Sequence, residues 1–192
     1  MMTNDTISLF PHDKIMAKTI IPLIPKWVRP NHITILRFIA TPFVLWLLVV
    51  GNYAWGLPVF ILVSFTDALD GSLARLRKQI TEWGTLYDPV ADKILIGGAL
   101  ILIVIEHINV YFGVLILAVE AITVVGACIQ KARGKKPSAN VYGKTKMFLE
   151  IVAVGFLLIA LWSGISLFVP FSIGTFALAI VFAVISLFTH GI

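Results

Sequence analysis

Four aspartates, an arginine and several small residues recur at regular spacing within an apolar part of the chain. This pattern, called the aspartate run below, reads Asp67-x-x-Asp70-Gly71-x-x-Ala74-Arg75, then eight residues, then Gly84-x-x-x-Asp88-x-x-x-Asp92. A charged residue in a membrane span costs about 2.5–3.5 kcal/mol on insertion scales, so such residues usually serve a function. Four carboxylates require a counter-charge, which a divalent metal ion can supply.

The spacing of the aspartate run predicts two neighbouring helices. Its first half follows an i, i+3, i+4, i+7 pattern, which places its members on one helix face. The members of its second half recur every four residues and also share a face. The connection from Leu76 to Trp83 is short, so the helices should be antiparallel, with their carboxylates near one membrane surface. Pro89 suits a first helical turn, so the second helix begins at 84 or nearer 88.

The ligand types favour hard metal ions. Carboxylates without nearby Cys or His select Mg²⁺, Mn²⁺ or Ca²⁺ over zinc. Four carboxylates exceed what one Mg²⁺ usually takes, so two ions bridging a phosphate-bearing substrate fit better. Gly71 and Ala74 leave room for a ligand, and Arg75 offers a planar fork for phosphate. The alternative is a structural cluster neutralised by protonation, Arg75, Arg37 and Lys93.

Composition indicates an all-α integral membrane protein. The 192 residues are 59% hydrophobic and 13% charged, with a mean hydropathy of +0.97, whereas soluble domains are about 25% charged. We expect a single domain over 1–192, with a juxtamembrane segment at 1–30 and a six-helix membrane part at 31–192. The lone Cys128 excludes an internal disulfide.

Six segments are long and apolar enough to be spans, which need about 20 residues. They are 32–50, 54–76, 84–105, 110–130, 144–163 and 168–189. All 15 Lys and Arg fall in 14–37, 75–78, 93 and 131–146. Basic residues stay on the cytoplasmic side, so both termini should be cytoplasmic. This distribution argues against nucleic-acid binding, although the net charge is +5.

The N-terminal segment predicts a short interfacial helix over 12–21. Lys14 and Lys18 share one face and a less polar set shares another, a pattern typical of a helix lying on anionic lipid. That set is Ile15, Met16, Thr19 and Ile20. The polar residues at 11–14 argue against a secretory signal peptide. The alternative is an unstructured tail.

The aspartate run resembles the signature of the CDP-alcohol phosphatidyltransferases at every motif position, with eight residues fixed over twenty-six. Pro30-Asn31-x-Ile33-Thr34-x-x-Arg37 is similar to the family's start of the first span. The resemblance implies that an alcohol hydroxyl attacks the β-phosphate of a CDP-linked lipid and releases CMP. It also implies two Mg²⁺ or Mn²⁺ ions, a homodimer, and a bacterial inner membrane with the active site facing the cytoplasm.

The resemblance also implies roles for individual residues. The metal ligands would be Asp67, Asp70, Asp88 and Asp92. Asp92 would also be the general base, since a carboxylate beside the attacking hydroxyl can take its proton. The nucleotide-binding positions would be Asn31, Thr34, Asp67, Gly71, Ala74 and Arg75. For Asn31 an N-cap of the first span is an equal alternative.

The acceptor lies outside the aspartate run. Thr81-x-x-Gly84-x-x-x-Asp88-Pro89-x-Ala91-Asp92-Lys93 and Gly143-Lys144-x-Lys146 are similar to phosphatidylglycerophosphate synthases. That branch implies CDP-diacylglycerol as donor and glycerol 3-phosphate as acceptor. The candidates for binding its phosphate are Arg37, Lys93, Arg133 and Lys144, with Lys131 and Lys146 as further basic residues. The alternative is a loop that only contacts anionic headgroups.

Other functions remain open. CMP-forming cardiolipin synthases share much of the pattern, and the inositol-phosphate and serine branches share less of it. An intramembrane prenyltransferase would normally need more spans. A cation transporter would distribute its acidic residues across the membrane. Glu120 and Glu150 are expected to be structural, either orienting a basic residue or lying protonated between helices.

Overall fold

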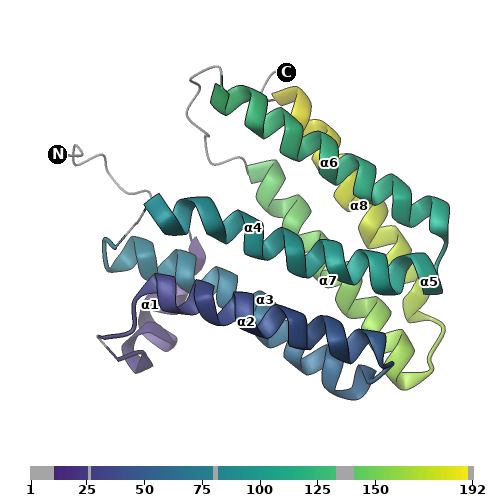
Figure 1. The fold of residues 1–192 in the computed structure, drawn as a ribbon, viewed down its shortest axis with the longest axis horizontal. Helices are drawn as coiled ribbons and strands as arrows, with labels where there is room; N and C mark the ends of the chain where they lie inside the picture. The colour runs from purple at the N-terminus through teal and green to yellow at the C-terminus, as the bar shows by residue number, and fades with distance from the viewer. Residues whose placement is uncertain (1–10, 26, 80–81, 133–140, 190–192) are drawn as a thin grey trace. The chain divides into compact units, whose positions relative to one another are not determined.

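A computed structural model describes residues 11–25, 27–79, 82–132 and 141–189. Within these ranges the regular structure is helical, and its order is shown in Figure 1. The elements are α1 (Pro11–Thr19), the 3₁₀ turn η1 (Ile21–Leu23), α2 (Pro30–Val49), α3 (Tyr53–Leu76), α4 (Glu82–Ala99), the π-helical η2 (Leu100–Val104), α5 (Ile105–His107), α6 (Val110–Ala132), α7 (Val141–Ser163) and α8 (Phe168–Thr189).

The predicted apolar segments are all helical, with ends displaced by a few residues. Segment 84–105 corresponds to α4, η2 and the first residue of α5, which follow one another without a break. The helix begins at Glu82, so the alternative start nearer 88 is wrong. The short helix predicted over 12–21 is confirmed as α1.

In the described part of the chain, α2, α3, α7 and α8 are long and apolar enough to cross a membrane. The apolar part of α6, Val110–Gly126, is shorter. The helix α4 is continuous but contains several charged residues: Glu82, Asp88, Asp92 and Lys93 lie within its 18 residues. The same carboxylates that indicate a function therefore lower its hydropathy.

The chain divides into two compact units. Unit 1 consists of residues 1–43 and 62–94, and unit 2 of residues 44–61 and 95–192. Unit 1 therefore contains α1, η1, the first part of α2, the second part of α3 and the beginning of α4. The whole aspartate run belongs to unit 1.

Unit 2 is built on the packing of α7 against α8, which lie side by side (Figure 1). Between them the Ser172 hydroxyl donates a 2.8 Å hydrogen bond to the Ala153 carbonyl. Phe176 is fully buried and meets Phe112 of α6 edge to face, with ring centroids 6.2 Å apart. Small residues at helix contacts allow such close approach in membranes: the buried ones include Ala153, Ala160, Ala179 and Ala183.

In unit 1 the segment before α2 is fixed to the end of α3 by Arg77. Its Nη2 donates to the Ile24 carbonyl at 2.7 Å, and its Nη1 donates to the Val28 carbonyl at 2.7 Å. The fork of the guanidinium reaches both carbonyls at once, which a lysine could not do. Lys78 follows with a φ of 54°, where the chain leaves the helix.

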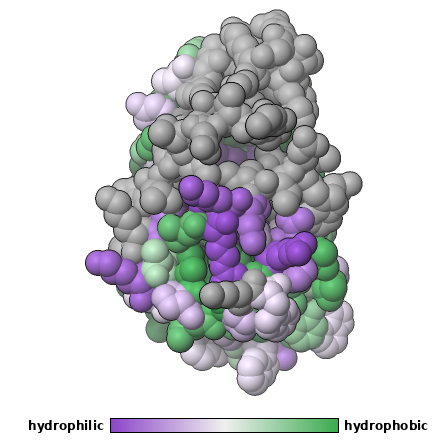
Figure 2. All heavy atoms as spheres, turned by 90° about the vertical axis from the view of Figure 1, so that its left-hand side faces the viewer, coloured by the Kyte–Doolittle hydropathy of each residue, from purple (hydrophilic) through white to green (hydrophobic). Residues whose placement is uncertain are grey.

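Hydrophilic side chains gather on the face shown in Figure 2, beside apolar ones. Among the side chains of unit 1 that the structure describes, the exposed basic ones are Lys18, Arg29, Lys78 and Lys93. Basic side chains next to exposed apolar ones, such as Leu23 and Trp27, suit the boundary between water and anionic lipid.

Candidate active site

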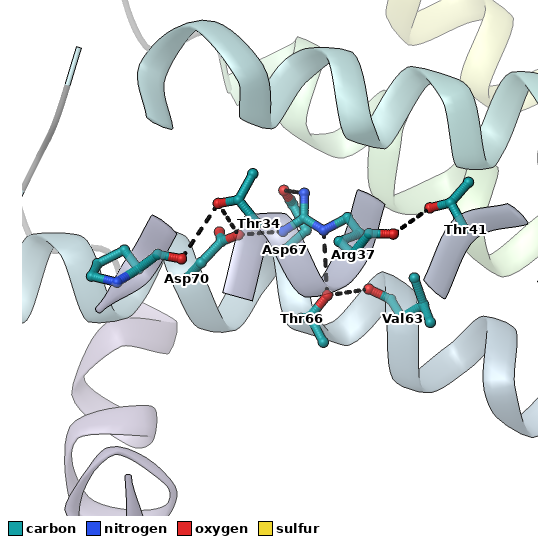
Figure 3. A network of polar contacts seen from close by, with 8 residues as sticks. Thr34, Arg37, Thr41, Val63, Thr66, Asp67 and Asp70 are labelled. Atoms are coloured by element: carbon teal, nitrogen blue, oxygen red, sulfur yellow. Dashed lines mark hydrogen bonds and ion pairs between the residues drawn. The ribbon is translucent and has the colours of Figure 1, made fainter. Parts of the chain in front are cut away.

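Two aspartates of the aspartate run share one arginine (Figure 3). Arg37 Nη1 donates to Asp67 Oδ1 at 2.6 Å, and Nη2 donates to Asp70 Oδ2 at 2.5 Å. The aspartates lie one turn apart on α3, so both carboxylates reach the arginine of α2. Arg37 is 1% exposed and Asp70 is 2% exposed. Burying charges this deeply is tolerated only when they are paired and hydrogen-bonded.

Three threonines make hydrogen bonds either to this arginine or to its partner Asp70. Arg37 Nε donates to Thr66 Oγ1 at 3.3 Å, and Thr66 donates to the Val63 carbonyl at 2.6 Å. Thr41 donates to the backbone carbonyl of Arg37 at 2.8 Å. The Thr34 hydroxyl lies 3.3 Å from Asp70 Oδ2 and 3.4 Å from the Pro30 carbonyl oxygen. Thr34, predicted to be near the nucleotide, thus contacts a carboxylate of the aspartate run.

Arg75 lies against Gly71 and is held by Asp13, which is not among the predicted site residues. A Cβ on Gly71 would lie 3.3 Å from Arg75 Nη1. On its other edge the guanidinium donates to Asp13 of α1, from Nε to Oδ2 and from Nη2 to Oδ1, both at 2.8 Å. One feature of the sequence points to Asp13: it lies three residues before the apolar Met16, so the two share a helix face. The structure buries both side chains.

The second half of the aspartate run lies on α4. Asp92 is half-buried and Lys93 is exposed. The side chain of Asp88 lies outside the described part of the structure, so its orientation stays a prediction, as does the role of Gly84. The antiparallel arrangement of the two halves is favoured by the short connection between Leu76 and Glu82.

The carboxylates fit a hard divalent cation. Asp67 and Asp70 converge on a single positive group, and the Asp67 side chain is 25% exposed, so a cation can approach it from solvent. Charge also favours a cation, since two carboxylates and one guanidinium sum to −1 before Asp88 and Asp92 are included. The described side chains alone form no group of three metal-binding residues.

The remaining predicted site residues are distributed over α2, α3, α7 and the part of the chain that the structure does not describe. Asn31 is the second residue of α2, inside the helix, so the N-cap alternative is wrong. Ala74 is half-buried on α3. Lys144 is exposed on α7 in unit 2. Arg133 lies outside the described residues.

Glu120 and Glu150 orient a basic residue, one of the two structural roles expected for them. Lys146 Nζ forms an ion pair with Glu120 of α6 and another, at 3.2 Å, with Glu150 Oε1. Lys146 is 8% exposed and Glu150 is 4% exposed. This buried group, called the Lys146 triad below, joins α6 to α7.

If Gly71 and Arg75 bind the nucleotide-bearing lipid donor, as the resemblance implies, Gly71→Ala is expected to weaken donor binding while stabilising the helix. The added Cβ would press on the Arg75 guanidinium at 3.3 Å, and a flexible arginine would shift. We expect a KM for the lipid donor about three- to tenfold higher, and a free energy of unfolding higher by up to about 1 kcal/mol, the usual gain on replacing glycine by alanine in a helix.

Gly97→Ala is the matched control, because a Cβ on Gly97 of α4 meets nothing within 4 Å. It should stabilise without changing KM. Equal KM values for Gly71→Ala and the parent enzyme would contradict the placement of the guanidinium beside Gly71.

Carboxylates and arginines gathered within apolar helices define a polar site in an integral membrane protein, and guanidinium groups of this kind are suited to phosphate-bearing ligands. The chain belongs to the CDP-alcohol phosphatidyltransferase family, since the model of that family matches residues 27–189. The family expected from the aspartate run is therefore confirmed.

Individual relatives agree with this assignment. The chain is 31% identical over 147 residues to the CDP-diacylglycerol–glycerol-3-phosphate 3-phosphatidyltransferase of Bacillus subtilis, an alignment covering 68% of this chain and 76% of the relative. It is 37% identical over 141 residues to a probable phosphatidylglycerophosphate synthase of Mycobacterium tuberculosis, covering 68% and 66%. It is 33% identical over 143 residues to a CMP-forming cardiolipin synthase of Streptomyces coelicolor, covering 70% and 66%.

Proposed function

We propose that this protein transfers the phosphatidyl group of CDP-diacylglycerol to glycerol 3-phosphate, forming phosphatidylglycerophosphate and CMP. The complete aspartate run within a family match over residues 27–189 carries this proposal. The Bacillus and Mycobacterium relatives, both named for this reaction, support the choice of acceptor.

The reaction is an exchange at the β-phosphorus of the donor. The acceptor hydroxyl forms a new P–O bond, the bond to the CMP oxygen breaks, and the hydroxyl proton passes to Asp92. Arg75 and Gly71 bind the donor diphosphate with Asn31, Thr34 and Ala74. The acceptor phosphate is bound by a basic residue from the set Lys93, Arg133 and Lys144, because Arg37 is buried and its guanidinium already binds Asp67 and Asp70.

Asp67, Asp70, Asp88 and Asp92 would hold two Mg²⁺ or Mn²⁺ ions. When bound, these ions stabilise the negative charge that develops on the diphosphate and on the departing CMP. The convergence of Asp67 and Asp70 at one place supports this set, because the ligands of one metal ion must lie close together.

We also propose the topology that this chemistry requires. Six spans place both termini and the aspartate run on the cytoplasmic side of a bacterial inner membrane, where glycerol 3-phosphate and CMP are soluble. The interfacial α1 lies on the same surface. The enzyme works as a homodimer, as the family resemblance implies.

A CMP-release assay tests the proposal. Purified protein is given CDP-diacylglycerol, Mg²⁺ or Mn²⁺, and one acceptor at a time: glycerol 3-phosphate, phosphatidylglycerol, inositol 1-phosphate or serine. We expect CMP with glycerol 3-phosphate and little with inositol 1-phosphate or serine. CMP release with phosphatidylglycerol alone would favour the second candidate, cardiolipin synthesis, which the Streptomyces relative supports.

No CMP with any acceptor would overturn the enzymatic proposal. In that case ion flux into liposomes that contain the protein would test the transporter alternative. Omission of divalent metal, with a chelator present, serves as the negative control for every acceptor.

A further inference from the structure

The N-terminal helix reaches the aspartate run through one buried carboxylate. Asp13 is 0% exposed, although it lies on a short helix at the edge of the membrane part. Its two oxygens accept hydrogen bonds from Nε and Nη2 of Arg75, each at 2.8 Å. A two-point contact between a carboxylate and a guanidinium is charge-assisted and sets the orientation of both groups.

A serine inside the aspartate run completes this contact. The Ser72 hydroxyl donates to Asp13 Oδ1 at 2.6 Å and is itself 0% exposed. Ser72 and Arg75 are three residues apart on α3, so they present their donors from one face of the helix. Asp13 therefore receives three hydrogen bonds from α3, which accounts for the burial of its charge.

The contact determines which edge of the guanidinium faces Gly71. Asp13 binds the Nε–Nη2 edge, whereas Nη1 lies beside the Cα of Gly71, 3.3 Å from the position of an added Cβ. Arginine has a long side chain with many rotamers, and its planar fork loses less freedom when it is already held in place. The Arg75 side chain is still 22% exposed, so the pairing with Asp13 does not seal it from a ligand.

We infer that Asp13 is a positioning residue for the lipid donor: it holds Arg75 over Gly71 in the orientation that binds the diphosphate of CDP-diacylglycerol. This inference rests on the proposed function. It assigns α1 a part in substrate binding in addition to its contact with the membrane surface. A tether that only fixed α1 in place would need neither the charge nor the two-point geometry.

The test compares Asp13→Asn and Asp13→Glu with the parent enzyme. For each protein, kcat, the KM for CDP-diacylglycerol and the KM for glycerol 3-phosphate are measured in the same mixed micelles, together with the midpoint of thermal unfolding. We expect Asp13→Asn to raise the KM for the donor about tenfold, the size expected when a charge-assisted pair is lost. The kcat and the KM for glycerol 3-phosphate should change by less than about twofold, and Asp13→Glu should restore part of the loss.

Thr19→Ala is the matched control, because Thr19 is an exposed residue of the same helix. It should leave all three kinetic constants unchanged. An unchanged donor KM in Asp13→Asn would overturn the inference. A fall in kcat proportional to a loss of folded protein, with both KM values unchanged, would also overturn it and leave a structural tether.

A double variant distinguishes action through Arg75 from a separate effect. If Asp13 works by holding Arg75, then Asp13→Asn should add little to the donor KM of Arg75→Lys, whereas independent effects would multiply. Should the parent release no CMP with any acceptor, the proposed function fails. Equilibrium binding of CDP-diacylglycerol to the parent and to Asp13→Asn then still decides the inference.

Discussion

Replacing Asp92 with asparagine is expected to lower the rate of CMP release by about 10²–10⁴-fold, the contribution typical of a general base. Asparagine has nearly the same shape, but its amide cannot accept the proton of the attacking hydroxyl. The side chain is half-buried on α4, and asparagine fills the same space. The donor should still bind, because Arg75 and Gly71 are unchanged.

The measurement separates binding from turnover. Equilibrium binding of CDP-diacylglycerol and single-turnover CMP release are compared for the parent and for Asp92→Asn. Glu82→Gln is the control, since it removes a carboxylate from the same helix at a position that the motif leaves variable. Normal turnover by Asp92→Asn would show that the base assignment is wrong.

The position of Asp92 at the end of the aspartate run allows a metal-ligand role as well, and a titration separates the two roles. If Asp92 acted only as a ligand, a higher concentration of Mn²⁺ would restore the rate by saturating a weakened site. A base cannot be replaced in this way, so we expect the rate of Asp92→Asn to remain low at every metal concentration.

Lys146→Met is expected to be strongly destabilising. Lys146 is 8% exposed and pairs with Glu120 and Glu150. Removing one partner of a buried ion pair usually costs about 3–5 kcal/mol, because a buried charge is left without compensation. For a chain of this length that cost lowers the midpoint of thermal unfolding by about 10 °C.

The control is Lys144→Met, which removes the same charge two residues away from an exposed position on the same helix. It should change the midpoint by less than about 2 °C, in line with the usual effect of a surface substitution. Adding Glu150→Gln to Lys146→Met should recover part of the loss, because one uncompensated carboxylate is removed. Equal midpoints for Lys146→Met and Lys144→Met would contradict a stabilising role for the Lys146 triad.

The helices could be predicted from sequence because their determinants are local. Long apolar runs such as 168–189 and 54–76 match α8 and α3 almost residue for residue. The shared face of Asp67 and Asp70 also follows from helical spacing, and both carboxylates reach Arg37. The family follows from the same residues, since the aspartate run is unusually specific.

Pairings between distant segments could not be predicted in the same way. Asp13 and Arg75 are 62 residues apart, and no periodic pattern links a carboxylate on one helix to a cation on another. The sequence suggests Arg37 as a ligand of the acceptor phosphate. A basic residue at the start of a span can pair with a ligand, a lipid headgroup or a carboxylate, and spacing alone does not distinguish them. The structure shows Arg37 bound to two carboxylates. For Lys146 the sequence suggests either a ligand of the acceptor phosphate or part of a loop that contacts lipid headgroups. In the structure it is buried in α7.

The pairing of Arg37 with two aspartates also bears on how the chain enters the bilayer. Each isolated charge adds about 2.5–3.5 kcal/mol to the apparent free energy of insertion at the centre of a span. Arg37 accompanies Asp67 and Asp70 as a built-in counter-ion, so this part of the hairpin of α2 and α3 carries a net charge of −1 (one positive, two negative) instead of −2. Part of the charge of the two carboxylates is therefore offset within the protein itself, so the insertion of these two helices depends less on a counter-ion from solution.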